Sequence, residues 1–411
     1  MPMNLADMLC YADIDQLTRI AQTYDCHTGS HSKNELIQSI LTVIHRREVL
    51  ESRMEEMSGD DLRFLNSLLF ENRMVYSMEE LKARAIGTAV TAAAAVLPES
   101  GKPAPKPDAK AKGTRSKKKQ AVPAEPAGPE DTARQTITRF KRFGWLFNGF
   151  SQQTRYLYQV PEDVKRRLCD ALERKFRLRL EEREEPPVYR DERGLLAEDL
   201  TVFLKYVRDN DCPLSVDGVL YKRQLGQVLE LMSVREEGPG KTGWRFGYGR
   251  KFRDYPDRFS LLYDFAYYEG LIRENPDRLI VTEEGLNTAD GQRRIDPAEL
   301  YRFWLRVYKG PIANLTALVQ WVNRLSAAWT TVSSLFEVLR PLIRSYYFDQ
   351  EQDVLERRVL GMMMHLGLLR WGETSSGEAL VKMTPQGSAV VSGIALTFED
   401  TLRLETIGRP G

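Results

Sequence analysis

The chain has little of what enzymes and metal proteins usually need. Its 411 residues include only four histidines and four cysteines. The cysteines lie far apart and form no CxxC pair, which argues against a disulfide framework and favours reduced thiols. No pairing of serine or cysteine with histidine indicates a nucleophilic site. We therefore expect no enzymatic activity, no cofactor and no small-molecule substrate.

Long apolar runs and net charge are also missing. No stretch of 18 apolar residues occurs, and the first residues lack the basic-then-apolar order of a signal peptide. These absences predict a cytoplasmic protein without a membrane partner. Because 59 basic residues face 58 acidic ones, any affinity for nucleic acid must come from local clustering of cations.

Residues 87–130 are rich in Ala, Pro, Lys and Gly and hold almost nothing large and apolar. This composition predicts a disordered linker. Between 102 and 119, seven Lys and one Arg face a single Asp. Such a run is either a solvated tether or a basic arm that adds salt-sensitive phosphate contacts, and the two interpretations are compatible.

Residues 1–47 predict a small helical domain. Ile14, Leu17 and Ile20 mark one apolar helix face, and Ser32 with Glu35 forms a capping box before a second apolar stripe. The arrangement resembles the helix-extended-loop-helix domains called SAP or Rho-N-like. That resemblance implies binding to DNA or RNA, with Lys33 as a candidate contact.

Two later segments repeat one pattern. "GLIRENPDRLIVTEEG" spans 270–285 and "GLLRWGETSSGEALVKMTPQG" spans 367–387. Each predicts a β-hairpin, because apolar runs flank a polar turn. Helical periodicity precedes both, near 257–269 and 350–366, with further helices upstream. Residues 48–86 and 131–185, which lie on either side of the linker, together give the same order of helices followed by a hairpin.

These patterns predict a mainly α fold with small β-hairpins. We expect tandem winged-helix units at 48–86 with 131–185, at 194–292 and at 295–398, preceded by the small helical domain and interrupted by the linker.

Residues 195–290 carry a family resemblance in "LKYVRDNDCPLSVDGVLYKRQL", "YPDRFSLLYDFAYYEGLI" and "LIVTEEG". This region resembles the helicase-associated winged-helix proteins of bacteria, which are related to the amino-terminal domain of the repair helicase XPB. The resemblance implies a DNA-binding or helicase-partner role without catalysis, in repair, replication or transcription. No helicase motor is present in the sequence, so ATP-coupled activity would have to come from a partner.

A winged helix offers its third helix to the major groove and its hairpin to the backbone, so cations should gather there. The candidate DNA contacts are Lys33, Arg134, Arg139, Lys141, Arg142, Lys222, Arg223, Arg245, Arg250, Lys251, Arg253, Arg258, Arg357 and Arg358. Aromatic residues interleave the cations of 244–258, which is typical either of base stacking or of a loop held down by its own rings with Arg over them. The methionines at 362–364 favour a packed core or a protein partner in the third unit.

Three patterns that suggest enzymes or metals have simpler interpretations. "GPGKT" at 238–242 lacks the spacing and flanking elements of a phosphate-binding loop and predicts a turn. Cys26, His27 and His31, with Cys10 upstream, match no standard zinc spacing. The glutamates at 181–185 face arginines and predict a solvated, salt-bridged helix end.

Two hypotheses follow. In the first, a nucleoid-associated protein holds duplex or forked DNA with tandem winged helices. In the second, the chain is an adaptor that docks a helicase or nuclease partner without touching DNA.

Overall fold

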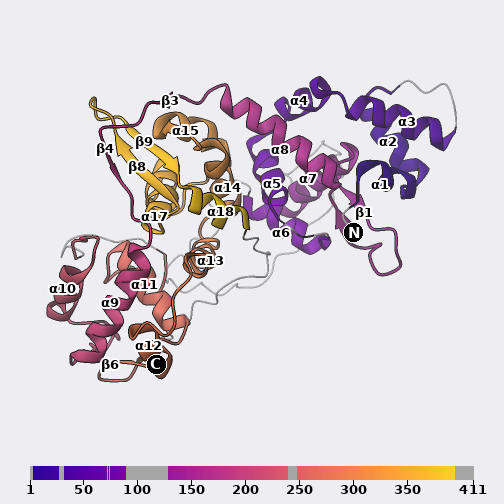
Figure 1. The fold of residues 1–411 in the computed structure, drawn as a ribbon. Coiled ribbons are helices and arrows are strands. Elements are labelled where there is room, and N and C mark those ends of the chain that lie inside the picture. Colours follow the sequence, from indigo (N-terminus) through magenta and orange to yellow (C-terminus); the bar gives the residue numbers. More distant parts are fainter. Residues whose placement is uncertain are drawn as a thin grey trace, which may run out of the picture.

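The computed structural model describes residues 3–26, 32–71, 73, 75–88, 128–238 and 248–393. These parts form a mainly helical, elongated molecule with small antiparallel sheets, as the sequence predicts (Figure 1). Most of the expected linker lies outside the described residues. The edges of its predicted range, 87–88 and 129–130, are helical instead.

Three regions of the described chain share one order of elements: a helix, a short strand or bridge, two more helices and a hairpin. The first repeat consists of α5 (Gly59–Leu69), the bridging residue Tyr76, α6 (Met78–Thr88), α7 (Pro129–Arg142), β1 (Phe147–Asn148) and β2 (Tyr158–Gln159). The second consists of α9 (Leu195–Asp209), a bridge at Pro213, α10 (Lys222–Leu231), α11 (Asp257–Tyr268), β5 (Ile272–Glu274) and β6 (Leu279–Val281).

The third repeat has the same order with a longer sheet. It consists of α14 (Leu315–Leu325), β7 (Trp329–Thr331), α15 (Val332–Leu339) with the 3₁₀ turn η2 (Arg340–Leu342), a continuous helix, β8 (Leu369–Glu373) and β9 (Ala379–Met383). The continuous helix is divided into α16 (Glu351–Asp353), the π-helical η3 (Val354–Leu360) and α17 (Gly361–His365). The helices and hairpins of all three regions lie close to where the hydrophobic periodicity and the turns predict them.

The strand between the first and second helices of each repeat is not evident in the sequence. Tyr76 and Tyr158 exchange two backbone hydrogen bonds, at 2.8 and 2.7 Å. In the second repeat, the N–H of Leu214 donates to Asp277 and that of Leu279 donates to Cys212. In the third, β7 pairs with β9. Each hairpin therefore gains a third strand that ties it to its own helices.

Other elements surround the repeats. The amino-terminal domain contains α1 (Leu5–Tyr11), α2 (Ile14–Thr23), α3 (Lys33–Ile44) and α4 (Arg47–Glu55). The remaining elements are α8 (Glu162–Arg177), β3 (Glu182–Arg183), β4 (Val188–Arg190), α12 (Glu283–Ala289), α13 (Pro297–Tyr308) and α18 (Pro385–Gly393).

The acidic stretch after α8 is not the helix end that its charges predict. Glu182 and Arg183 form β3, which pairs with β7, and residues 188–190 form β4, which pairs with β8. The order of the five-stranded sheet is β3-β7-β9-β8-β4. Backbone pairing to exposed sheet edges outweighs the local helical charge pattern here.

The third repeat packs against the first. In Figure 1 the third repeat lies between the other two. The Trp321 ring of α14 lies edge-on to Phe70 and to Phe176, and its indole N–H donates to Asn66 of α5 at 2.7 Å. Segments far apart in sequence therefore share one core.

The repeated Gly and Thr of the two similar segments close the second and third hairpins in the same way. Gly270 and Gly367 adopt left-handed φ values of 69° and 70°, which cost glycine little. In the second repeat, the Thr282 hydroxyl donates to the carbonyl of Gly270 and accepts the N–H of Gly285. Thr384 makes the equivalent bonds with Gly367 and Gly387 in the third.

The glycine three residues after each threonine is required by a close backbone approach. A Cβ at position 285 would overlap the carbonyl oxygen of Leu271, and one at 387 would overlap that of Leu368. The helix after each hairpin therefore starts directly on the backbone of the first strand. This close approach explains why the chain repeats the spacing.

We predict that Gly387→Ala destabilises the protein by about 1–3 kcal/mol, because the new methyl group forces backbone apart in a packed region. Gly226→Ala, in α10, meets no atom within 4 Å and should stabilise by about 0.5–1 kcal/mol. Urea unfolding followed by circular dichroism measures both. Equal stabilities for the two variants would contradict this account of the hairpin closure.

Candidate nucleic-acid interface

The third helix of the first repeat presents cations to solvent. On α7, the apolar residues Ala133, Ile137 and Phe140 are buried, whereas Arg134, Arg139 and Arg142 are exposed. Arg139 forms an ion pair with the buried Asp61 of α5, so its charge is already compensated. Arg142 has no carboxylate partner among the described residues. The exposed face of α7 therefore keeps positive charge that could meet phosphate.

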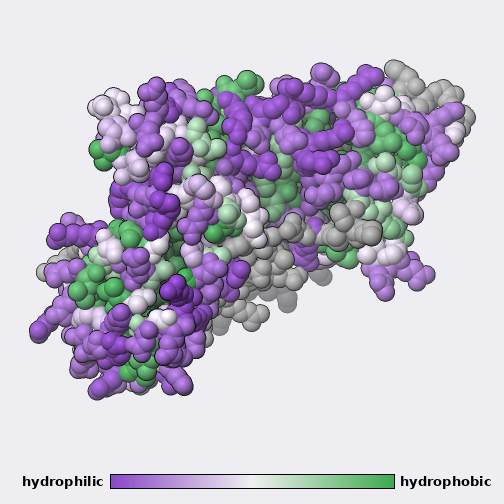
Figure 2. Space-filling model, viewed as in Figure 1, coloured by the Kyte–Doolittle hydropathy of each residue, from purple (hydrophilic) through white to green (hydrophobic). Residues whose placement is uncertain are grey.

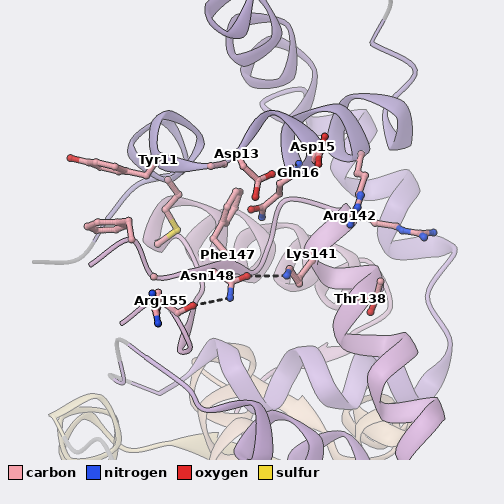
Figure 3. Close-up of a pocket in the computed structure, with 15 residues that line it drawn as sticks. Tyr11, Asp13, Asp15, Gln16, Thr138, Lys141, Arg142, Phe147, Asn148 and Arg155 are labelled. Atoms are coloured by element: carbon pink, nitrogen blue, oxygen red, sulfur yellow. Dashed lines mark hydrogen bonds between the residues drawn. The ribbon is translucent and has the colours of Figure 1, made fainter. Parts of the chain in front are cut away.

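A groove of about 530 Å³ runs between α1 and α2 on one side and α7 with the first hairpin on the other (Figure 3). The Nζ atom of Lys141 donates to the side-chain oxygen of Asn148 at 2.9 Å, and the Asn148 amide donates to the carbonyl of Arg155 at 3.2 Å. These bonds fix the hairpin against α7. The charged lining of the groove consists of Arg19, Lys141, Arg142 and Arg155 with Asp13 and Asp15.

The groove is lined by more cationic than anionic side chains. Burial lowers the pKa of Lys141, Asp13 partly offsets that effect, and the nearby Arg19 adds to it. Arg19, Arg142 and Arg155 form no ion pair within the described part of the chain. Four cations against two carboxylates therefore favour an anionic ligand.

Exposed aromatic rings border this groove. Tyr11 at the end of α1 and Phe150 in the hairpin stack with centroids 4.3 Å apart and planes 17° apart. They remain 63% and 46% exposed. Tyr156, on the same hairpin, is 70% exposed, with Arg155 over its ring. These rings are not among the sequence-predicted contacts, although aromatic residues in the otherwise polar hairpin "NGFSQQTRY" are a signal that could have identified two of them.

Three of the cations predicted as DNA contacts in the second repeat, Arg250, Lys251 and Arg258, point inward, which argues against this role for them. Arg258 is 1% exposed, and its guanidinium lies 2.6 Å from Asp199. Lys251 is 3% exposed and donates to the carbonyl of Asp217. Arg250 pairs with Glu274 at 3.1 Å and lies 3.7 Å from the Tyr267 ring. These three side chains have inward partners, and little of them is exposed.

The rest of this segment agrees with the simpler interpretation of a loop held by its rings. Tyr248 and Tyr255 are buried, and Arg253 is exposed with its guanidinium 5.6 Å from the Phe252 ring. Arg245, Trp244, Phe246 and most of "GPGKT" lie outside the described residues.

The third repeat requires the same correction. Arg358 is 1% exposed and pairs with Asp349 at 2.8 Å and with Asp257 of α11 at 3.2 Å. Arg357 is exposed but lies 2.9 Å from Asp257. Met362, Met363 and Met364 are buried, as their spacing predicts. The third helix of this repeat is therefore a core element.

The remaining predicted contacts are dispersed. Lys222 and Arg223 are exposed at the start of α10. Lys33 begins α3, and its Nζ atom donates to the carbonyl of Cys10, next to Tyr11. Among the candidates that the structure describes, only Lys141 and Arg142 line the groove, and Arg19 and Arg155 join them there.

The reason α11 cannot act as a recognition helix is that α13 covers it. Residues 258–266 of α11 are all buried. Phe265 packs edge-on against Phe303 of α13 at 5.3 Å, and Arg306 of α13 pairs with Glu269. A helix that is apolar around most of its circumference belongs in a core, and "FSLLYDFAYY" is apolar except for Ser260 and Asp264.

The described residues also bear on the metal and membrane expectations. Within the described ranges, no group of His, Cys, Asp and Glu side chains could hold a metal ion, and His27 and His31 lie outside those ranges. No helix of the described chain is both long and apolar enough to cross a bilayer. No protein-family model matches the chain, and neither a curated protein nor a solved structure matches it.

We predict that Arg258→Met destabilises the protein by about 3–5 kcal/mol, because Asp199, which is fully buried, loses its countercharge. Adding Asp199→Asn should recover part of this loss, since the orphaned charge disappears. Arg223→Met, at an exposed position, should change stability by no more than about 0.5 kcal/mol. Melting temperatures of these variants, of Asp199→Asn alone and of the unaltered protein test this, and additive effects of the Asp199 and Arg258 changes would contradict the pairing.

Asp264 of α11 should give the second repeat a pH-dependent stability. Burial raises its pKa to about 7, against the opposing effects of the Arg250 backbone N–H and the Arg250 charge. The folded state therefore holds this proton more tightly than the unfolded state. The free energy of unfolding should fall as the pH rises from about 4 to about 7, by up to about 1.4 kcal/mol per pH unit.

In Asp264→Asn this descent should be absent. Comparing urea midpoints of both proteins at about pH 5 and about pH 7.5 isolates the contribution, because other groups titrate equally in the two. If the difference between the proteins is the same at both pH values, Asp264 is ionised throughout and the prediction is wrong.

Proposed function

We propose that this chain is a non-catalytic DNA-binding protein whose three repeats are winged helices. The order of helix, strand, helix, helix and hairpin in each repeat supports this, because it is the order in which a winged helix presents its third helix and its wing. In such a protein DNA would bind the first repeat, and association with the nucleoid would follow from that binding.

The observation that carries the proposal is the basic groove between α2, α7 and the first hairpin. The arginines of the groove lack carboxylate partners within the described residues, and α7 exposes polar residues along its whole length. Arg134, Gln135, Thr138 and Arg142 line the open side of α7, where they can meet phosphates or base edges. The second and third repeats then support this end of the molecule and do not read DNA with their third helices.

We predict that Arg134→Gln, Arg142→Gln and Arg155→Gln together weaken binding to random duplex at low salt. The slope of log affinity against log salt should become shallower by roughly 0.9 for each phosphate that the variant no longer neutralises. A control variant, Arg294→Gln with Arg302→Gln, removes two exposed cations near α13 and should leave the slope unchanged. Fluorescence anisotropy over a salt series measures both.

Two results would count against the proposal in different ways. If the unaltered protein does not bind duplex at low salt, the proposed function is wrong. If the control variant loses as much affinity as the triple variant, DNA binds elsewhere on the molecule.

The adaptor role is a second candidate, and exposed apolar residues of the second repeat favour it. Val216 is fully exposed and Leu231 is 56% exposed. Tyr221, next to Lys222, is 53% exposed. Figure 2 shows hydrophobic residues gathered over this repeat. A helicase or nuclease partner recovered by pull-down after nuclease treatment, and lost in Val216→Ser with Leu231→Ser, would support it.

A further inference from the structure

The groove and its aromatic rim fit a more specific ligand than duplex DNA. Resting on the proposed function, we propose that this site receives an unpaired base of a DNA strand, so that the interface recognises the junction between duplex and single strand. The support comes from the rings, the polar lining and the position of the cations.

The stacked rings offer a surface for a third ring. Tyr11 and Phe150 lie almost parallel and cover one face of each other, so each keeps an outer face. Their high exposure means that these faces meet water. Nucleobases stack on such rings irrespective of sequence, because every base has a π face. A base within an intact duplex shows the protein only its edge, so a ring face can be used only by an unpaired or terminal base.

The groove behind the rings suits a base in size and chemistry. Its volume of about 530 Å³ lies within the range of small-ligand sites. Gln16 points into it (Figure 3), and the Gln16 side-chain nitrogen is buried without a hydrogen-bond partner among the described residues. A buried donor of this kind favours a ligand that supplies an acceptor. The edge of a base carries both hydrogen-bond acceptors and amino donors. An acceptor would meet the Gln16 nitrogen, and an amino group would face the Asp13 carboxylate.

The charges separate a path for the backbone from the site of the base. Lys141, Arg142 and Arg155 lie on the side of α7 and the hairpin, whereas Asp13, Asp15 and Arg19 lie on α2 and its cap. The first side therefore attracts phosphates more strongly than the second, where two carboxylates outnumber one cation. A strand leaving a duplex bound on α7 would therefore run along the hairpin and turn its base toward Gln16.

The test compares forked DNA with a blunt duplex of the same paired sequence. Arms of about ten nucleotides suffice, because single-strand sites span about 4 to 16 nucleotides. We expect roughly tenfold tighter binding to the fork, within the range that stacking of one base provides. A 2-aminopurine placed at the junction should change fluorescence on binding.

Tyr11→Ala with Phe150→Ala should remove most of the fork preference, measured as the ratio of fork to blunt-duplex affinity, and most of the fluorescence change. Tyr11→Phe keeps the ring and should keep the preference. Tyr221→Ala removes an exposed ring beside α10 and serves as the control.

The outcomes are distinguishable. Equal binding of fork and blunt duplex by the unaltered protein, or a fork preference that survives in the double variant, overturns this inference and leaves the proposed function standing. Failure to bind either DNA overturns the proposed function itself.

Discussion

Two neighbouring charges at the start of α11 hold the second and third repeats together, and the rest of the molecule depends on this contact. Arg258 points inward to Asp199 and lies 3.7 Å from Glu192, whose carboxylate lies 2.8 Å from the ring nitrogen Nδ1 of His365 in α17. Asp257 points outward to Arg357 and Arg358 of the third repeat. Buried charges of this kind must keep their partners, because an unpaired ion is costly in a protein interior.

This contact determines which helices can meet a ligand. It places the third helices of the second and third repeats next to each other, and α13 covers α11 from another side. Burial raises the pKa of Glu236, whose carboxylate nonetheless accepts the N–H groups of Arg258 and Phe259 and so caps α11. Among the third helices of the three described repeats, α11 has no exposed residue, the helix of the third repeat exposes Gln352, Asp353 and Arg357, and α7 exposes polar residues along its whole length. The exposure of α7 therefore differs from that of the other described third helices, although the three repeats share one order of elements.

Much of the fold follows from the sequence because it depends on local signals. The periodicity around Phe259 and Leu262 predicts α11, and the Gly and Thr spacing predicts the hairpins that Gly285 and Gly387 close. The pairing of β3 and β4 with the distant third repeat has no local signal, since it depends on edges formed by residues more than a hundred positions later. The burial of Arg258 could not be predicted from the sequence either, because its partner Asp199 is distant in the chain and no local pattern links the two.

The sequence predicts only the part of the candidate site that α7 contributes. The cations of α7 stand out as a basic face on an amphipathic helix, but Tyr11 and Arg19 come from a domain that the sequence treats as separate. Their approach to Phe150 and Lys141 is set by packing of α2 against α7, where the Tyr24 hydroxyl donates to the carbonyl of Phe143. Tertiary packing, and not sequence spacing, assembles the groove.

The first hairpin differs from the other two in how it is fastened, and this difference bears on function. Gly144 has the left-handed φ of 65° found at Gly270 and Gly367, but Val160 and Pro161 follow the hairpin where the others have a threonine. No hydroxyl therefore closes it against the next helix. It is held instead by the Tyr76 bridge, by the bond from Lys141 to Asn148 and by the ring contact of Phe150 with Tyr11. Two of these three contacts involve residues that line the groove, so a ligand entering the groove would act directly on the position of the hairpin.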